Sequence, residues 1–301
     1  MTDGGRPADD GTISWRDLLA EATARLARSG SETAEIDARR IVEEATGVEP
    51  AGFHAVLAEL ATVRGVAAFD TMVARREQGE PLQYVVGRWG FRHLDLMVDP
   101  RVLIPRPETE EVAGLAIDEV NSRAGDREVL VADLGTGSGA IGLSVAQECA
   151  SARVLATDIS DEALQVARAN LAGIGRAAAR VSLHAGSWYD ALPSSVRGSL
   201  DVVISNPPYV TDDEALPAVV DDWEPRGSLR AGADGLDDLT VIVDAAADWV
   251  APGGAVVLEM APTQTALIAE RFVALGWAAA VHTDLQGRDR AVVARRPLGS
   301  S

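Results

Sequence analysis

The stretch that decides the fold is Glu128-Val-Leu-Val-Ala-Asp-Leu-Gly-Thr-Gly-Ser-Gly139, which an apolar segment, 140–149, follows at once. The run that ends at Asp133 is typical of a buried strand, and the apolar segment is typical of a helix. Glycines at alternate positions permit a sharp turn and let a ligand approach the backbone without a Cβ in the way. The N-terminus of the helix offers unpaired N–H groups to an anion. The stretch therefore predicts a strand, a ligand-binding turn and a helix.

The chain after Gly125 repeats this alternation of strand-like and helix-like segments. Strands are predicted at seven short apolar runs, at residues 128–133, 153–157, 180–184, 200–205, 254–259, 278–282 and 288–294. Helices are predicted between them, at residues 139–149, 161–171, 236–250 and 263–275. The alternation favours the α/β class, with an open and mostly parallel sheet that carries helices on both faces.

The first 80 residues have a different pattern, in which glycines interrupt helical spacing. Helices are predicted over residues 13–28, 31–45, 53–60 and 66–78. From Pro81 the period changes to two, so residues 83–86 and 89–98, separated by Gly87, predict a hairpin. The resulting division has four parts, namely a flexible tail at 1–11, a helical domain at 12–79, a hairpin linker at 80–107 and an α/β domain at 108–301.

Composition limits the function. The 301 residues include 46 acidic and 27 basic side chains, all of the latter arginine, and the formal net charge is −19. Such a charge repels a phosphate backbone and disfavours direct DNA binding. One cysteine and four scattered histidines indicate neither a disulfide framework nor a metal site. There is no run of 18 apolar residues and no secretion-signal pattern at the start, so we expect a cytoplasmic protein without a membrane span.

The glycine loop is compatible with two classes of cofactor. Gly137-Ser-Gly-Ala-Ile-Gly142 matches the fingerprint of dinucleotide-binding proteins. The triplet in Gly135-Thr-Gly-Ser-Gly139, preceded by Asp133, resembles instead the S-adenosylmethionine loop of Rossmann-like methyltransferases. We favour the methyl donor over a nicotinamide, and either ligand over a tight turn that binds nothing.

Asp158 ends the second strand of this unit. A carboxylate at that place can accept hydrogen bonds from both hydroxyls of a ribose. The alternative role is to cap the helix that begins near Asp161, for which Ser160 is a nearer candidate. We favour the ribose role.

The segment Leu200-Asp-Val-Val-Ile-Ser-Asn-Pro-Pro-Tyr209 indicates the chemistry. Its strand delivers Asn206 to the carboxyl edge of the sheet, where ligands bind in open α/β sheets. The two prolines that follow have fixed φ angles and no N–H to donate, so the loop is stiff and presents carbonyl oxygens. The alternative is an ordinary proline-rich turn after a strand.

This loop suits transfer of a methyl group to a planar nitrogen. The nitrogen of an amide or an aromatic amine is a poor nucleophile, because its lone pair is delocalised. Two fixed acceptors, the side-chain oxygen of Asn206 and the carbonyl of Pro207, can hold its two N–H bonds and aim the lone pair at the methyl carbon. Tyr209 can stack on the planar group. No strong general base is needed, because the nitrogen becomes acidic as it is alkylated.

Nearly the whole chain resembles the protein-(glutamine-N5) methyltransferases that modify peptide chain release factors. The resemblance rests on the helical N-terminal region, the glycine loop, Asp158 and a set of motifs in the family order. These motifs are Glu80-Pro-Leu-Gln-Tyr84, Leu103-Ile-Pro-Arg-Pro-Glu-Thr-Glu110, Asn206-Pro-Pro-Tyr209, Glu224-Pro-Arg226, Gly232-Ala-Asp-Gly-Leu236 and Gly253-Gly254 with Glu259. The combination of the second and third motifs is specific to this family.

The resemblance implies a Rossmann-like class I methyltransferase that uses S-adenosylmethionine and no metal. It implies methylation of the side-chain amide of the glutamine in the Gly-Gly-Gln motif of class 1 release factors, by a monomer that binds them through its helical domain. The residues implied to contact the methyl donor are Gly135, Thr136, Gly137, Ser138, Gly139, Asp158, Trp188 and Asn206. Those implied to bind the glutamine are Asn206, Pro207, Pro208 and Tyr209, of which Asn206, Pro207 and Tyr209 carry the catalysis.

The chain departs from the family pattern at two places. Ser187 stands before Trp188, where the family has an acidic or larger polar residue. Glu259-Met-Ala-Pro262 replaces a Glu-x-Gly pattern, and we assign this turn no function. Arg106 and Thr109 either line the pocket or have a purely structural role.

Three other functions remain as alternatives. A DNA or RNA methyltransferase acting on an exocyclic base amine would use the same loop, with Tyr209 stacked on a flipped base. The net charge of −19 and the lack of an arginine-rich segment argue against it. A nicotinamide oxidoreductase would leave the Asn206–Tyr209 segment unexplained, and an inactive binding module would not need that segment intact.

Overall fold

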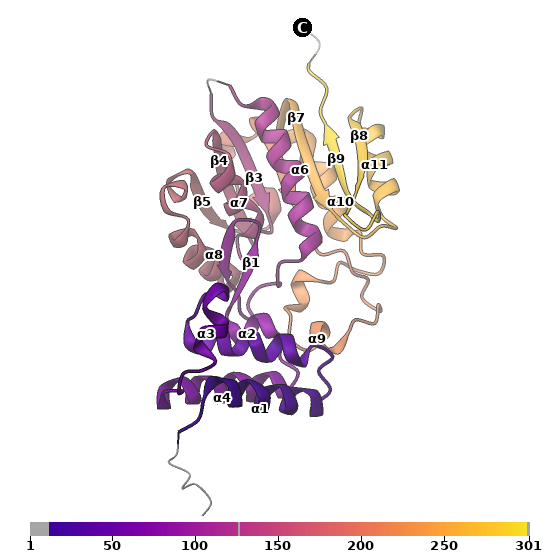
Figure 1. The fold of residues 1–301 in the computed structure, drawn as a ribbon. Coiled ribbons are helices and arrows are strands. Elements are labelled where there is room, and N and C mark those ends of the chain that lie inside the picture. Colours follow the sequence, from indigo (N-terminus) through magenta and orange to yellow (C-terminus); the bar gives the residue numbers. More distant parts are fainter. Residues whose placement is uncertain (1–11, 126, 300–301) are drawn as a thin grey trace, which may run out of the picture. The chain divides into compact units, whose positions relative to one another are not determined.

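The computed structural model describes residues 12–125 and 127–299 (Figure 1). The chain divides into two compact units, Met1–Gly87 and Arg88–Ser301. The expected flexible tail at 1–11 lies outside the described residues.

The first unit is built from helices. Three long ones, α1 (Trp15–Arg28), α2 (Ala34–Thr46) and α4 (Val63–Glu77), bury a shared apolar core. Short elements complete the unit, namely η1 (Pro50–Gly52), α3 (Phe53–Val56) and α5 (Leu82–Val86). The hydroxyls of Ser14 and Thr62 cap the first turns of α1 and α4, which satisfies N–H groups that have no partner within a helix.

One predicted strand is wrong. Residues 83–86, expected as half of a hairpin, belong to helix α5, which ends at Gly87 with a φ of +73°. The side chain of Arg75 in α4 donates hydrogen bonds to the carbonyls of Tyr84 (2.9 Å) and Val85 (3.1 Å), and Val85 packs into the helical core. Tertiary contacts of this kind override a short alternating pattern. The helical unit therefore extends to Gly87, eight residues beyond the expected boundary.

The hairpin itself opens the second unit, as β1 (Arg88–Phe91) and β2 (Leu94–Met97). The predicted helix at 53–60 is also shorter than expected, since α3 ends at Val56.

The second unit contains a seven-stranded sheet in the order β5-β4-β3-β6-β7-β9-β8. Its strands are β3 (Val129–Leu134), β4 (Ala152–Asp158), β5 (Val181–Ala185), β6 (Leu200–Ser205), β7 (Val250–Glu259), β8 (Ala278–Thr283) and β9 (Asp289–Arg295). Only β9 runs against its neighbours. The predicted open and mostly parallel sheet is confirmed.

Helices cover both faces of the sheet (Figure 1). Residues of α6 (Pro107–Arg123) and α7 (Ala140–Glu148) share one apolar cluster with Val131 of β3. Residues of α10 (Asp237–Trp249) and α11 (Thr265–Ala274) share the other cluster with Ala132. Neighbouring residues of a strand point to opposite faces, so the apolar residues of β3 supply both cores.

The remaining described elements connect these layers. They are α8 (Asp161–Gly173), η2 (Gly175–Arg180), η3 (Trp188–Ala191), η4 (Ser194–Val196), α9 (Ala218–Asp221) and η5 (Arg226–Ser228).

The strand order creates a binding edge. The chain moves outward from β3 to β4 and β5, and then returns to β6 on the other side of β3. The register pairs Leu134 with both Thr157 and Ser205, and Ser205 with Leu258, so four parallel strands end together. Ligands bind at such a topological switch point, outside the carboxyl ends of the strands.

Candidate active site

The glycine loop makes the sharp turn expected from its sequence. Gly135, Gly137 and Gly139 have φ angles of +72°, +55° and +87°, a region that residues with a Cβ rarely adopt. The amide of Thr136 donates to the carbonyl of Thr157 (2.8 Å), which ties the loop to the end of β4. The loop is thus held at the carboxyl edge of the sheet.

Asp133 supports the loop from inside the protein. Its Oδ2 accepts hydrogen bonds from the Thr136 hydroxyl (2.5 Å) and the Gly142 amide (2.9 Å). Helix α7 can approach this closely because residue 142 is glycine: a Cβ there would lie 2.7 Å from that oxygen. Burial raises the pKa of Asp133 to about 6. Its Oδ1 is buried and has no hydrogen-bond partner among the described residues, so a polar atom remains available beside the loop.

Asp158 lies at the end of β4, next to the glycine loop. Its Oδ2 accepts from the Gly137 amide and its Oδ1 from the Ser160 amide, both at 2.9 Å. Burial raises its pKa, against the effect of these backbone hydrogen bonds. The cap of α8 is Ser160, whose hydroxyl accepts from the Ala163 amide (3.1 Å). The structure thus assigns the cap to Ser160 and leaves Asp158 at the ligand edge.

Trp188 lies over the same loop. A Cβ at Gly135 would approach the indole ring to 3.0 Å, so the ring rests against the glycine backbone. The residue is half-buried and has a φ of +44°. Burial raises the pKa of Asp238, and a hydrogen bond from Trp188 opposes that shift. Ser187, the departure from the family pattern, is exposed.

Asn206 follows β6 directly and reaches the same edge. The hydroxyl of Ser205 donates to the Leu134 carbonyl (2.6 Å), which fixes the end of β6 against β3. Asn206 is half-buried, and its Nδ2 donates to the Thr109 hydroxyl (3.3 Å). The glycine loop, Asp158 and Asn206, predicted from separate segments, are therefore brought together on three neighbouring strands.

The loop after Asn206 is fixed by its backbone. Pro207 is buried, and the amides of Tyr209 and Val210 both donate to the Leu229 carbonyl, at 3.2 and 2.9 Å. The Tyr209 carbonyl accepts from Gln264 Nε2 (3.0 Å). Three hydrogen bonds to two residues, Leu229 and Gln264, thus hold the backbone of the loop in place.

Arg106 and Thr109, each expected either to line the pocket or to have a structural role, differ in their contacts. Thr109 is buried in the first turn of α6 and contacts Asn206. Arg106 donates to Glu224 Oε1 (2.5 Å), and the other oxygen of Glu224 accepts from the Ile104 amide (3.2 Å). Arg106 therefore anchors its own loop to that of Glu224, while Thr109 belongs to the site.

Sequence reasoning missed Glu259. This residue ends β7, one position beyond Leu258, which pairs with Ser205. Its side chain is completely buried, and burial raises its pKa to about 7. Burial also raises the pKa of Tyr209, as does the nearby charge of Glu259. The available signal is an acidic residue at the end of an apolar strand, and the altered turn that follows, Met260-Ala-Pro262, obscures it.

Among residues 12–125 and 127–299, no group of three or more His, Cys, Asp or Glu side chains is placed to hold a metal ion, and no helix is long and apolar enough to cross a membrane.

Comparisons with known proteins agree with this geometry. The family model described as PrmC N-terminal domain matches residues 17–87, and the one described as Methyltransferase small domain matches residues 116–223. The first match ends at the same residue as the helical unit. The catalytic domain of hMettl16, solved with the MAT2A 3'UTR hairpin 6, is 14% identical with a TM-score of 0.52, and the match covers 81% of this chain and 86% of that one. At this identity the likeness shows the fold alone.

Curated relatives match almost the full length. The release factor glutamine methyltransferase of Streptomyces coelicolor is 41% identical over 289 residues, which cover 93% of this chain and 97% of that protein. The enzyme of the same name from Deinococcus radiodurans is 38% identical over 290 residues, which cover 95% and 100%. With its Rossmann-like methyltransferase sheet and its helical N-terminal unit, the chain belongs to the release factor glutamine methyltransferase family.

Proposed function

We propose that this protein transfers the methyl group of S-adenosylmethionine to the side-chain amide nitrogen of the glutamine in the Gly-Gly-Gln motif of class 1 peptide chain release factors. The observation that carries the proposal is the position of Asn206, which stands at the switch point of the sheet beside the glycine loop. A held glutamine amide would there face a methyl donor lying on the loop.

The residues at the edge fit S-adenosylmethionine. The free Oδ1 of Asp133 and the open glycine loop offer polar groups beside a backbone that a ligand can approach. Asp158 would hold the ribose hydroxyls, and the ring of Trp188 would lie against the adenine. The donor contacts would thus come from Gly135–Gly139, Asp158, Trp188 and Asn206. When bound, the donor supplies a sulfonium methyl group.

The chain's own contribution is orientation. Asn206 Oδ1 and the Pro207 carbonyl would accept the two N–H bonds of the glutamine amide, which turns the nitrogen lone pair toward the methyl carbon. These dipoles also stabilise the positive charge that develops on the nitrogen. Pro208 keeps the loop rigid and Tyr209 packs against the amide plane. Transfer would form a new N–C bond as the S–CH3 bond of the donor breaks with its electron pair left on sulfur; the amide nitrogen would release one proton to water, and S-adenosylhomocysteine would be the other product.

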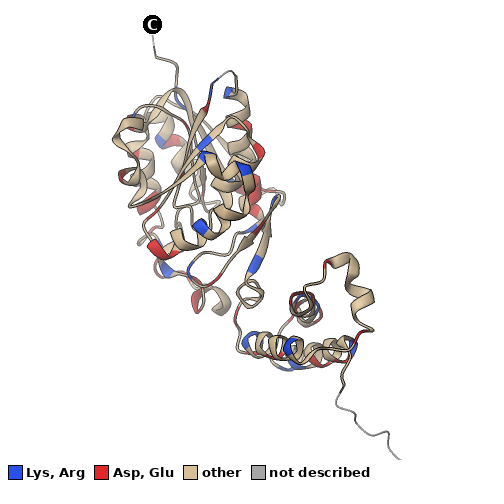
Figure 2. Ribbon diagram, turned by 90° about the vertical axis from the view of Figure 1, so that its left-hand side faces the viewer, with Lys and Arg blue, Asp and Glu red and all other residues tan. Residues whose placement is uncertain are grey.

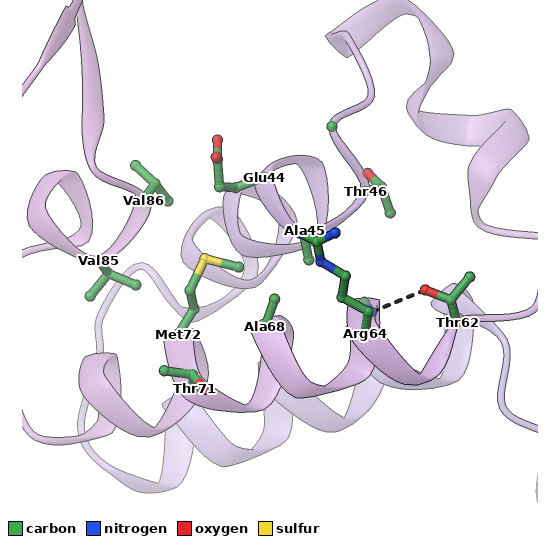
Figure 3. A pocket seen from close by; sticks show the side chains of 12 residues that line it. Glu44, Ala45, Thr46, Thr62, Arg64, Ala68, Thr71, Met72, Val85 and Val86 are labelled. Carbon is green, nitrogen blue, oxygen red and sulfur yellow. Dashed lines mark hydrogen bonds between the residues drawn. The ribbon is translucent and has the colours of Figure 1, made fainter.

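The helical unit is our candidate for binding the rest of the release factor. A groove with a volume of about 600 Å³ lies in it between α2 and α4, with α5 at one end (Figure 3). Ala68 and Met72 of α4 face Glu44 and Ala45 of α2 across the groove, and Arg64 extends over it. The groove offers apolar and charged contacts together, which suits a protein surface.

The proposal extends to the oligomeric state, the location and the metal requirement of the enzyme. Because all proposed catalytic and donor-binding residues lie in the second unit of one chain, we propose a monomer. We place the reaction in the cytoplasm, where translation ends, and propose that no metal takes part.

The test is transfer of radiolabelled methyl from S-adenosylmethionine to a purified class 1 release factor. A factor with Gly-Gly-Ala in place of Gly-Gly-Gln and a DNA duplex serve as parallel substrates. We expect label on the unmodified factor alone. Label on both factors would contradict the glutamine assignment, and label on DNA would show that the loop acts on a base amine instead.

A further inference from the structure

Behind Asn206, the structure brings together two polar side chains from other elements. Thr109, 3% exposed, comes from the first turn of α6, and Glu259, 0% exposed, ends β7. Asn206 Nδ2 donates to Thr109 Oγ1 at 3.3 Å. The pairing of Ser205 with Leu258 makes Asn206 and Glu259 the next residues on adjacent parallel strands. Both side chains are polar, and buried polar groups normally have hydrogen-bond partners, so we ask which partners these two serve.

The buried carboxyl group of Glu259 has no hydrogen bond of standard geometry with any residue that the structure describes. The hydroxyls of Thr109 and Tyr209 lower the pKa of Glu259, which is the effect expected of nearby hydroxyls that can turn a hydrogen toward a carboxylate. A buried carboxylate without donors is strongly disfavoured, and a hydroxyl hydrogen rotates toward the best acceptor. The single hydrogen of Thr109 is therefore directed to Glu259.

This arrangement determines what Thr109 can offer to Asn206. A threonine hydroxyl has one hydrogen and two lone pairs, and a carboxylate has only lone pairs. Once the hydrogen is donated to Glu259, only a lone pair of Thr109 faces Asn206. Asn206 must then turn its NH2 group toward Thr109, which leaves Oδ1 as the atom presented away from it.

We propose that Thr109 and Glu259 are positioning residues that set the orientation of the Asn206 amide, so that its oxygen and not its NH2 group faces the nitrogen to be methylated. This inference rests on the role proposed above for Asn206. With the amide reversed, two N–H groups would face each other, and the substrate nitrogen would lose one of its two acceptors. The series of side chains Glu259, Thr109 and Asn206 thus selects one of two orientations of the Asn206 amide, which have nearly the same shape.

The pKa of Glu259 makes the orientation of the Asn206 amide sensitive to pH. Burial raises the pKa of Glu259 to about 7, and the charge of Glu108 on α6 acts in the same direction. The hydroxyls of Thr109 and Tyr209 lower this pKa, as does the charge of Arg290 on β9. Arg290 itself lies 4.0 Å from Glu108 and 3.8 Å from Asp284. Protonation of Glu259 supplies a competing hydrogen, which removes the demand on Thr109. The orientation of Asn206 is therefore expected to be lost on the acid side of neutrality.

The main test compares Thr109→Val with Thr109→Ser in the full-length enzyme. Valine keeps the shape of the side chain and removes the hydroxyl, whereas serine keeps the hydroxyl. We expect Thr109→Val to lower kcat at least about tenfold, which corresponds to about 1.4 kcal/mol. The KM for S-adenosylmethionine should change less than about twofold, and Thr109→Ser should restore kcat. Ser144→Ala is the matched control, since that buried hydroxyl bonds only to Ala140 of its own helix.

A second variant, Glu259→Gln, keeps the inference testable if Thr109→Val folds poorly. The wild-type kcat should rise with pH through about 7, and Glu259→Gln should lack that rise because its side chain cannot ionise. Unchanged kcat in Thr109→Val, equal losses in Thr109→Val and Thr109→Ser, or an unchanged pH profile in Glu259→Gln would each overturn the inference. If these results came with an inactive Asn206→Ala enzyme, the proposed function would stand and only the positioning role would fall. An active Asn206→Ala enzyme would remove the basis of both.

Discussion

At the scale of single residues, the two carboxylates nearest the glycine loop have different tasks because they have different partners. Asp133 is fully buried and bonds to Thr136 and Gly142, so it holds the loop together. Asp158 accepts hydrogen bonds from backbone amides, including those of Gly137 and Ser160, and lies at the carboxyl edge of the sheet. A ligand can share or replace those amide contacts, but it cannot replace the internal bonds of Asp133.

The first prediction concerns Asp158. We expect Asp158→Ala to raise the KM for S-adenosylmethionine about 10- to 100-fold, the equivalent of losing hydrogen bonds to a charged group worth about 1.5–3 kcal/mol. Because the ribose is remote from the transferred methyl, kcat at saturating donor should change much less. Steady-state kinetics with varied donor would measure both constants. Asp161→Asn removes an exposed charge from the same region and should leave both constants unchanged.

The second prediction concerns Asn206. Asn206→Ala should lower kcat by at least about 10²-fold, which is typical when a fixed dipole is removed from a transition state. The melting temperature should change by only a few degrees, since the side chain is half-buried and makes one long hydrogen bond. Methyl-transfer assays and thermal unfolding of the same preparation would separate the two effects. Asn121→Ala, an exposed asparagine on α6, is the control, and comparable rates in the two variants would refute the role of Asn206.

At the scale of elements, the contact between β3 and α7 depends on one small residue. A Cβ at Gly142 would lie 2.7 Å from Asp133 Oδ2 and 3.2 Å from Val154 Cγ1, so the helix can pack here only with glycine. Gly114, in α6, has a more open surrounding, where a Cβ would meet only the Arg92 side chain at 3.4 Å. Glycine is therefore required by packing at position 142, whereas position 114 has room for a Cβ.

The third prediction compares these glycines. Gly142→Ala should lower the free energy of unfolding by about 1–3 kcal/mol, as overpacking of a buried contact does. Gly114→Ala should be neutral or raise that free energy by up to about 1 kcal/mol, because alanine is the better helix former. Urea denaturation would give both values. Equal effects of the two substitutions would mean that α7 can move away from Asp133.

At the scale of the whole molecule, charge is widely distributed, and most arginines form ion pairs although the 46 acidic residues outnumber the 27 basic ones. Figure 2 shows basic positions scattered among acidic ones in both units. Many pairs join distant segments: Glu119 of α6 bonds to Arg295 of β9, and Glu148 of α7 bonds to Arg92. Arginines committed to such pairs are less available to bind phosphates, which agrees with a protein substrate.

The fourth prediction concerns the helical unit. Ala68 is exposed and lines the groove, while the neighbouring Ala67 is equally exposed and does not line it. Ala68→Trp should fill part of the groove and raise the KM for the release factor about tenfold or more, with kcat and the KM for S-adenosylmethionine unchanged. Ala67→Trp should have no effect on any of the three. A release-factor KM unaffected by Ala68→Trp would show that the factor binds elsewhere.

The fifth prediction concerns stability and pH. The pKa of Glu259 rises from its ordinary value of 4.5 to about 7 on folding, so the folded protein holds a proton that the unfolded chain releases. Its contribution to stability therefore falls as pH rises from about 4.5 to 7, by at most about 3 kcal/mol. Glu259→Gln should remove this slope, so that its stability relative to wild type improves from pH 5 to pH 8 in urea denaturation.

Glu119 provides the opposite sign as a control. Although burial alone would raise its pKa, hydrogen bonds from Arg295 and Arg123 lower it overall. The stability that it contributes is present above the ordinary glutamate pKa and is lost as pH falls. Glu119→Gln should therefore lose stability mainly at neutral pH and little near pH 4. Parallel pH profiles for Glu119→Gln and Glu259→Gln would contradict both pKa shifts.

The sequence by itself determined the features that depend on local constraints. The period of apolar residues located the seven strands of the sheet and most of the long helices, because each period matches one backbone geometry. Glycines at 135, 137 and 139 and prolines at 207 and 208 restrict the backbone by their own covalent structure, so both loops could be recognised directly. The resemblance to the release factor glutamine methyltransferases was visible because it rests on short motifs of this local kind.

Only the tertiary structure decided which residues meet. Residues 83–86 became helical because Arg75, in another helix, bonds to their carbonyls. Glu259 joined the site because the sheet register sets the end of β7 beside that of β6, over 50 residues away in the chain. Thr109 contacts Asn206 for a similar reason, through the packing of α6 on the sheet. The contacts of Glu259 and Thr109 join segments distant in sequence, and no local sequence pattern shows that these segments meet.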